Sequence, residues 1–202
     1  MRKIFKILVI LLALQCIYST FNYYNLQYSY INNDLINKYD ISQYINIPPP
    51  VIDISACLTA SNKRDGKSIT EVIIHHDSIQ YCPYTPIFDI NRYHIKKGFG
   101  SIAYHYYISK KGKIYKLHNH EDITAHTKWK NTHTLSVCIQ GNYSNEFISK
   151  LQYKSLIELL SYLSLDVAFH STYNDTQCPG RNLNLGTIRN DLQKQHLLCK
   201  IL

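Results

Sequence analysis

The sequence predicts an α/β fold in which a central mixed β-sheet is flanked by helices. Short runs of apolar, β-branched and aromatic residues predict strands, and three longer segments with apolar residues along one side predict helices. The two kinds of segment follow one another without strict alternation, which argues for a mixed sheet. Because 45% of the 202 residues are hydrophobic and 18% are charged, the chain can bury the core of one domain.

The N-terminus has the pattern of an export signal. The basic segment MRKIFK precedes the apolar run ILVILLALQCI, which is too short to cross a bilayer as a helix. Residues 1–19 are therefore predicted to be a signal peptide cleaved after Ser19, and the protein to be secreted or periplasmic. An uncleaved N-terminal anchor is one alternative. Lipidation of Cys16 is another, although Gln15 is larger than the residue usual before a lipidated cysteine.

Residues 20–50 are interpreted as a linker or N-terminal arm. They are rich in Tyr and Asn, show no helical or strand period, and end in three prolines, which favour an extended backbone. The arm leads into a domain that we assign to residues 51–202. Within it, residues 51–68 are expected to approach the first core strand.

The charge of the chain favours an anionic partner such as a cell-wall polymer. The formal net charge is +8, and loss of the three basic residues of the signal peptide would lower it by three, to +5. Nucleic acid is not expected as a partner, because no run of Lys and Arg is interleaved with aromatic residues.

The first half of the domain predicts one buried strand, one helix and one hairpin. Residues 71–74 form a short apolar strand that delivers His75 or His76 at its end. Residues 86–97 have the period of an amphipathic helix, and a glycine follows as a stop signal. Aromatic and β-branched residues on both sides of the turn KKGK predict a β-hairpin over residues 103–117.

The second half predicts two more strands and two more helices. Residues 135–140 predict a strand that ends in a Gly-Asn turn, and residues 165–169 predict a strand at the sheet edge that delivers His170. Residues 149–164 form the clearest amphipathic helix, and residues 185–199 form a closing helix. The side of the helix 149–164 that packs on the sheet is expected to carry Leu151, Ser155, Leu159, Tyr162 and Leu163.

Besides Cys16 and Cys178, the chain has four cysteines: Cys57, Cys82, Cys199 and Cys138. The sequence predicts the environment of Cys138. That residue lies inside the apolar strand pattern LSVCIQ and is expected to be a small buried hydrophobic residue. Because an exported protein can form disulfides, Cys57 and Cys82 are the expected pair. Other pairings that involve Cys199 stay open.

The segment HSTYNDTQCPGR carries the chemistry on which the functional prediction depends. Its many Ser, Thr, Asn, Asp, Pro and Gly residues predict a loop, and it places His170 and Cys178 eight residues apart. Neutral imidazole and thiolate are ligands of zinc, and a catalytic zinc site has three protein ligands and one open position. The third ligand is expected to be His75 or His76, and only one of them can face the ion because neighbouring strand residues point to opposite faces.

Four segments in this order resemble a known family. They are VIIHHDS, DINRYHIKKGFGSIAYHYYISKKGKIYKL, AHTKWKNTHTLSVCIQGNYS and HSTYNDTQCPGR. From about Glu71 to Arg181 the chain is similar to the zinc-dependent N-acetylmuramoyl-L-alanine amidases of the second type, which include the amidase-type phage lysozymes and the peptidoglycan recognition proteins. The resemblance implies the same α/β architecture, a bound Zn²⁺, and hydrolysis of the amide bond between N-acetylmuramic acid and L-alanine. Peptidoglycan or muropeptides are the implied partners, and we expect a monomer.

The resemblance also implies which residues bind the metal. The family's ligand is the first histidine after the apolar strand, so zinc binding is expected for His75, His170 and Cys178. His76 is then left to support the site or to line the substrate groove. Tyr104 stands where the family places a tyrosine or a carboxylate beside the reacting water.

Three more residues are expected to serve the reaction or hold the substrate. Thr176 stands two residues before the ligand cysteine, where a hydroxyl can donate to an oxygen that gains negative charge. His126 matches a histidine that many family members carry along the groove. Asn131 lies with Trp129 in the loop before the next strand, where an exposed amide or aromatic group can hold a sugar or a stem peptide.

Together these residues predict a zinc hydrolase. Zinc lowers the pKa of a water molecule toward neutrality and polarises the amide carbonyl. No carboxylate is assigned as general base, because neither Glu121 nor Asp175 matches the family's pattern. Two other functions stay open: a recognition module that binds peptidoglycan without cutting it, and a zinc peptidase that cuts within the stem peptide. The resemblance argues against the first, since such modules typically lack the metal-binding cysteine that this chain keeps.

Overall fold

The structure, a computed structural model, describes residues 48–58, 62–65, 68–80 and 82–201, with side chains as far as residue 195. The predicted signal peptide and most of the predicted arm lie outside the described residues, so both stay predictions. All described residues belong to one compact unit, Asn46–Leu202. None of the described helices is long and apolar enough to span a membrane.

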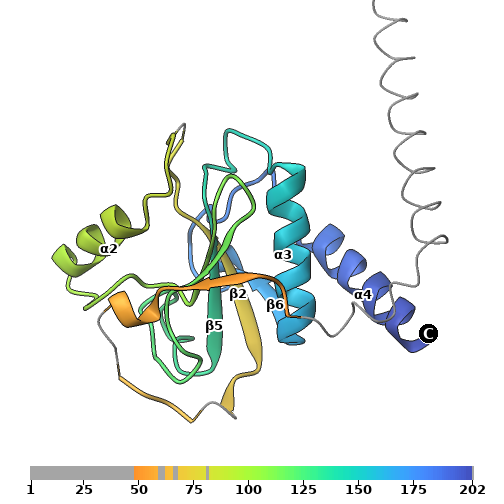
Figure 1. Cartoon of the computed structure of the whole chain (residues 1–202), viewed down its shortest axis with the longest axis horizontal. Coiled ribbons are helices and arrows are strands. Elements are labelled where there is room, and N and C mark those ends of the chain that lie inside the picture. The colour runs from red at the N-terminus through yellow and green to blue at the C-terminus, as the bar shows by residue number, and fades with distance from the viewer. Residues whose placement is uncertain (1–47, 59–61, 66–67, 81, 202) are drawn as a thin grey trace, which may run out of the picture. The chain divides into compact units, whose positions relative to one another are not determined.

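Within the described residues, six strands form one mixed sheet, as the sequence predicts (Figure 1). Their order across the sheet is β1 (Val51–Asp53), β4 (Ile114–Lys116), β3 (Tyr106–Ile108), β5 (Thr134–Ile139), β2 (Glu71–His76) and β6 (Asp166–Phe169). The predicted β3–β4 hairpin is antiparallel, while every other pair of neighbouring strands is parallel. Parallel neighbours need long crossover connections, and α3 lies in the connection between β5 and β6.

Helices lie on both faces of this sheet (Figure 1). The helices α3 (Lys150–Leu163) and α4 (Leu185–Ile201) pack on one face and contact each other. The helix α2 (Ile87–Lys96) lies on the opposite face. Two short 3₁₀ turns complete the described elements, η2 (Ser55–Cys57) after β1 and η4 (His170–Thr172) directly after β6. All three predicted helices are thus present, within a few residues of their predicted bounds.

The alternation of side chains along β2 separates His75 from His76. Val72 and Ile74 belong to the core that packs against α3 and α4, and His76 points the same way, stacked on a tyrosine of that core. His75 pairs in register with Cys138 of β5, which packs on the α2 side of the sheet. His75 therefore lies on the α2 face, because successive side chains of a strand point to opposite faces.

The predicted buried face of α3 is correct at Leu159, which is buried, and at Leu163, which packs against the core, but it is wrong at two other positions. Leu151 and Tyr162 were assigned to it, but their exposed fractions are 61% and 51%. The buried side chains of the helix are Gln152, Leu156, Ile157, Leu159 and Leu160. The amide of Gln152 donates to the carbonyl of Gln140 at 2.9 Å, which satisfies a polar group inside the core. A helical period assigns glutamine to solvent and cannot reveal this distant partner.

The expected disulfide between Cys57 and Cys82 is also wrong, because both residues are free thiols. Cys57 is exposed on η2, whereas Cys82 lines a surface hollow beside Ser109 and Gln140. A disulfide needs α-carbons within about 7 Å of each other, a condition that spacing along the sequence cannot establish. Cys138 is fully buried in β5, as predicted.

Residues 51–53 are more regular than predicted, since they form the edge strand β1 beside β4. All three side chains are exposed, including the apolar Val51 and Ile52, so burial does not mark this strand. The backbone hydrogen bonds to β4 define it instead.

Candidate metal centre

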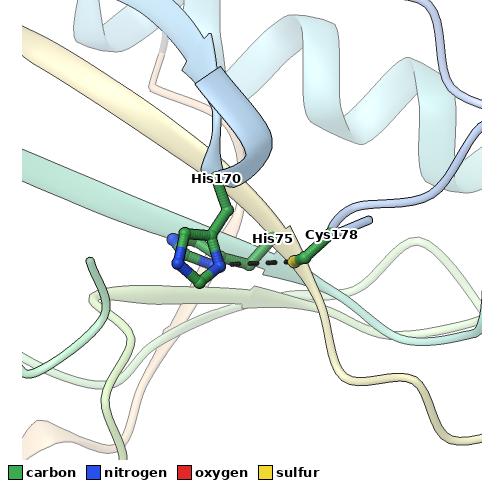
Figure 2. Close-up of side chains that lie close together, drawn as sticks. All are labelled: His75, His170 and Cys178. Carbon is green, nitrogen blue, oxygen red and sulfur yellow. Dashed lines mark hydrogen bonds between the residues drawn. The ribbon is translucent and has the colours of Figure 1, made fainter. Parts of the chain in front are cut away.

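Two neighbouring parallel strands bring the candidate ligands together. Ile74 of β2 pairs in register with Phe169 of β6, so His75 and His170 follow at the same end of the sheet. Their ring centroids are 4.6 Å apart. The chain then loops back and places Cys178 Sγ 3.8 Å from His75 Nδ1 (Figure 2). One donor atom from each of the three residues lies within 4.8 Å of the others.

This donor set fits zinc. Two imidazole nitrogens and one sulfur are ligands that zinc prefers, and three protein ligands leave one tetrahedral position open. Zinc bond lengths of about 2.1 Å to nitrogen and 2.3 Å to sulfur separate these atoms by roughly 3.6 Å at a tetrahedral angle. The distance of 3.8 Å between His75 Nδ1 and Cys178 Sγ is close to that value. In the described part of the chain, no other group of three metal-ligating side chains converges in this way.

Residues 170–178, which we call the ligand loop, are held by local hydrogen bonds. The N–H of Ser171 donates to the carbonyl of Cys178 at 2.9 Å and closes the loop. The Nε2 atom of His170 lies 3.1 Å from Asn174 Oδ1, which orients the ring. Thr176 Oγ1 accepts the N–H of Cys178 at 3.2 Å, so this hydroxyl is placed next to the cysteine as its sequence position suggests.

Burial sets the charge state of the ligands. It lowers the pKa of His75 well below the usual value, and the neighbouring His170 and His76 lower it further. Burial also lowers the pKa of His170. The pKa of the Cys178 thiol is raised to about 11 by burial, although the N–H of His76 donates to its sulfur at 3.4 Å and opposes the shift. The neutral imidazoles are thus ready to coordinate a metal, which has to displace only the thiol proton.

His76 supports the site from the other face of the sheet. Its Nδ1 accepts the N–H of Tyr143 at 3.2 Å, and its Nε2 lies 2.9 Å from the hydroxyl of Ser78. Burial lowers the pKa of this ring to about 4, so it is neutral. Both nitrogens of the His76 ring therefore have partners within the domain, and its ring lies on the other face of the sheet from His75.

Tyr104 lies against the metal ligands. Its ring centroid is 5.4 Å from that of His75, and its phenol lies beside the thiols of Cys138 and Cys178. Burial raises the pKa of Tyr104 well above its usual value, and the neighbouring thiols raise it further. The phenol therefore favours its protonated form, in which it can donate or accept a hydrogen bond.

His126 and Asn131 are predicted from the sequence to contact the substrate. In the structure, both side chains contact other residues of the domain. His126 is 5% exposed and packs edge-on against His75, with ring centroids 5.4 Å apart. The Oδ1 atom of Asn131 accepts the N–H of Thr127 at 2.8 Å and holds the loop in which both residues lie. Trp129 of the same loop is exposed, and Lys128 lies over its ring.

Thr127 is a site residue that the sequence does not single out. Its Oγ1 lies 3.3 Å from His75 Nε2, on the side of the ring opposite to Cys178. The only signal in the sequence is its place after His126 in the segment AHT. A threonine in a loop has no feature that distinguishes a contact with a metal ligand from an ordinary turn.

Gly180, two residues after Cys178, packs closely against the backbone of another segment. Its φ is +110°, and a Cβ atom there would overlap the backbone of Tyr143 and Ser144. We expect Gly180→Ala to lower the free energy of unfolding by about 2–4 kcal/mol, because strained backbone and overlap with rigid backbone both add cost. Chemical denaturation measures this loss. Gly98→Ala is the matched control, because Gly98 also has positive φ (+83°) but open space around it. Equal losses in the two variants would show that overlap plays no part.

Residues 65–181 match the sequence model of a family described as N-acetylmuramoyl-L-alanine amidase. The chain belongs to this amidase family. The matched range spans more than half of the chain and includes His75, His170 and Cys178. No curated protein matches this amidase-family chain.

Solved structures share the fold of this amidase-family domain. The endolysin N-acetylmuramoyl-L-alanine amidase LysCS of Clostridium intestinale is 25% identical, with a TM-score of 0.65 over 73% of this chain and 98% of that chain. Bumblebee PGRP-SA is 22% identical, with a TM-score of 0.62 over 70% of this chain and 95% of that chain. A mutant of Drosophila PGRP-LB in complex with tracheal cytotoxin is 20% identical, with a TM-score of 0.56 over 69% and 92%. The two PGRP structures support the fold assignment alone.

Proposed function

We propose that this protein is a zinc-dependent enzyme that hydrolyses the amide bond between N-acetylmuramic acid and L-alanine in peptidoglycan. The observation that carries the proposal is the convergence of His75, His170 and Cys178 in a chain of the amidase family. A zinc ion held by these three residues supplies a Lewis acid for the amide carbonyl and for water.

The residues around the ligands have separate roles in the proposed reaction. Tyr104 keeps its phenolic proton and donates it in a hydrogen bond to the reacting groups beside Cys178. The oxygen of Thr176 accepts the N–H of Cys178, and this bond leaves the hydroxyl's own proton to donate to the carbonyl oxygen as it gains negative charge. The buried ring of His75 stays neutral, as coordination requires.

The proposed setting is outside the cytoplasm. The signal-peptide pattern of residues 1–19 supports export. The net charge, +8 for the whole chain and 8 − 3 = +5 after loss of the signal peptide, supports attraction to an anionic wall polymer. We expect the protein to act as a monomer on peptidoglycan or on soluble muropeptides.

The test of this function is the release of stem peptides from purified peptidoglycan. With the purified protein, mass spectrometry is expected to detect free peptides that begin with L-alanine next to an intact glycan. A zinc chelator should stop their release, and added zinc should restore it. Peptides cut between two amino acids would indicate the stem-peptide peptidase instead. Tight binding without any released peptide would indicate a recognition module and would overturn the proposal.

A further inference from the structure

We propose that a directional chain of buried hydrogen bonds behind His75 holds this ligand in the one tautomer that can bind the metal. The chain runs from the backbone carbonyl of Lys130 through Thr134, His126 and Thr127 to Nε2 of His75. Thr127 and His126 are thus positioning residues for the metal ligand. The inference rests on the proposed metal centre, but it concerns how the protein holds its ligand and not which bond it cuts.

The distances define a continuous chain. Thr134 Oγ1 donates to the carbonyl of Lys130 at 2.8 Å, and His126 Nε2 lies 3.2 Å from the same Oγ1. His126 Nδ1 lies 3.0 Å from Thr127 Oγ1, which in turn lies 3.3 Å from His75 Nε2. The side chains are almost fully buried, with Thr127 1% and Thr134 2% exposed.

The direction of the chain follows from its first member, because a carbonyl oxygen can only accept. Thr134 therefore uses its proton on Lys130 and accepts from His126, which must carry its proton on Nε2. His126 Nδ1 is then an acceptor and takes the hydroxyl proton of Thr127. Thr127 Oγ1 in turn accepts from His75, so the proton of His75 lies on Nε2.

This tautomer leaves the lone pair of His75 on Nδ1, the nitrogen that lies 3.8 Å from Cys178 Sγ. The reverse direction would place a proton on that nitrogen and would take the Thr134 proton away from the Lys130 carbonyl, so it makes one hydrogen bond fewer. His170 shows the same arrangement in a shorter form, since Asn174 Oδ1 accepts from its Nε2. In metal sites, a hydrogen-bond acceptor for the ring N–H that does not face the metal fixes the tautomer and the orientation of a histidine ligand.

The tautomer can be measured directly on the metal-free protein. Long-range ¹H–¹⁵N spectra of histidine-labelled protein are expected to show His75 and His126 each with a single proton on Nε2. In Thr127→Val, which removes the hydroxyl and keeps the shape, His75 should become a mixture of both tautomers. A proton of His75 on Nδ1 in the unmodified protein would overturn the proposal, whatever the variants do.

Zinc affinity gives the second readout, by competition with a chromogenic chelator. Thr127→Val is expected to bind zinc roughly 10- to 100-fold more weakly, the range for lost partners of histidine ligands. Thr127→Ser restores the hydroxyl and should restore both the affinity and the single tautomer. Thr124→Val is the matched control, because this buried hydroxyl lies 3.3 Å from His105 and not in the chain to His75.

The outcomes separate this inference from the proposed function. Unchanged zinc affinity and an unchanged His75 tautomer in folded Thr127→Val would overturn the inference. Equal losses in Thr127→Val and Thr124→Val would also overturn it, because they would show a general effect of buried hydroxyls. Neither measurement uses peptidoglycan, so a failure to cut the wall would leave both results standing.

Discussion

Replacing Cys178 with serine is expected to abolish zinc retention and nearly all peptidoglycan hydrolysis. The sulfur is one of only three donors that converge in the described structure, and a serine hydroxyl does not ionise to replace a thiolate ligand. A metal ion supplies several kcal/mol of transition-state stabilisation. At 1.36 kcal/mol for each factor of ten, a loss of about 4 kcal/mol lowers the rate roughly 10³-fold. Elemental analysis measures the bound zinc, and the rate of stem-peptide release measures activity.

The control for this substitution is Cys57→Ser, because Cys57 is an exposed free thiol outside the metal centre. It should keep both the zinc and the activity. A Cys178→Ser protein that kept zinc and still released stem peptides would show that Cys178 is not a ligand.

Replacing Tyr104 with phenylalanine is expected to separate metal binding from catalysis. The variant loses only the phenolic O–H, which lies beside Cys178 and keeps its proton because burial raises the pKa of the group. Zinc content should therefore stay unchanged. The kcat should fall by roughly 10²- to 10³-fold, the range seen when one hydrogen-bond donor to developing charge is removed. Steady-state kinetics on a soluble muropeptide give kcat, and elemental analysis gives the zinc content.

A second tyrosine provides the control. Tyr153 of α3 donates its hydroxyl to Asp191 of α4 at 2.7 Å, and it packs against the core on the face of the sheet opposite to that of Tyr104. Tyr153→Phe should keep full kcat. If Tyr104→Phe were equally active, Tyr104 would be a packing residue and the role proposed for it would be wrong.

The local sequence determined much of the scaffold of the site. An apolar run before the histidines predicts β2, and a loop composition between His170 and Cys178 predicts that both can turn toward one ion. The strand period also required that only one of His75 and His76 face the metal. These features are local, so residue type and spacing are enough to predict them. The order of the four family segments then indicated which histidine binds.

Only the tertiary structure decided how the ligands are held and which faces are buried. The partner of His75 Nε2 is Thr127, 52 residues away, and the buried ring of His126 contacts Thr127 in turn. The buried amide of Gln152 likewise depends on the carbonyl of Gln140, which follows β5 and lies outside α3. A polar group can be buried only where folding supplies its hydrogen-bond partner, and no local period records a partner that comes from another strand.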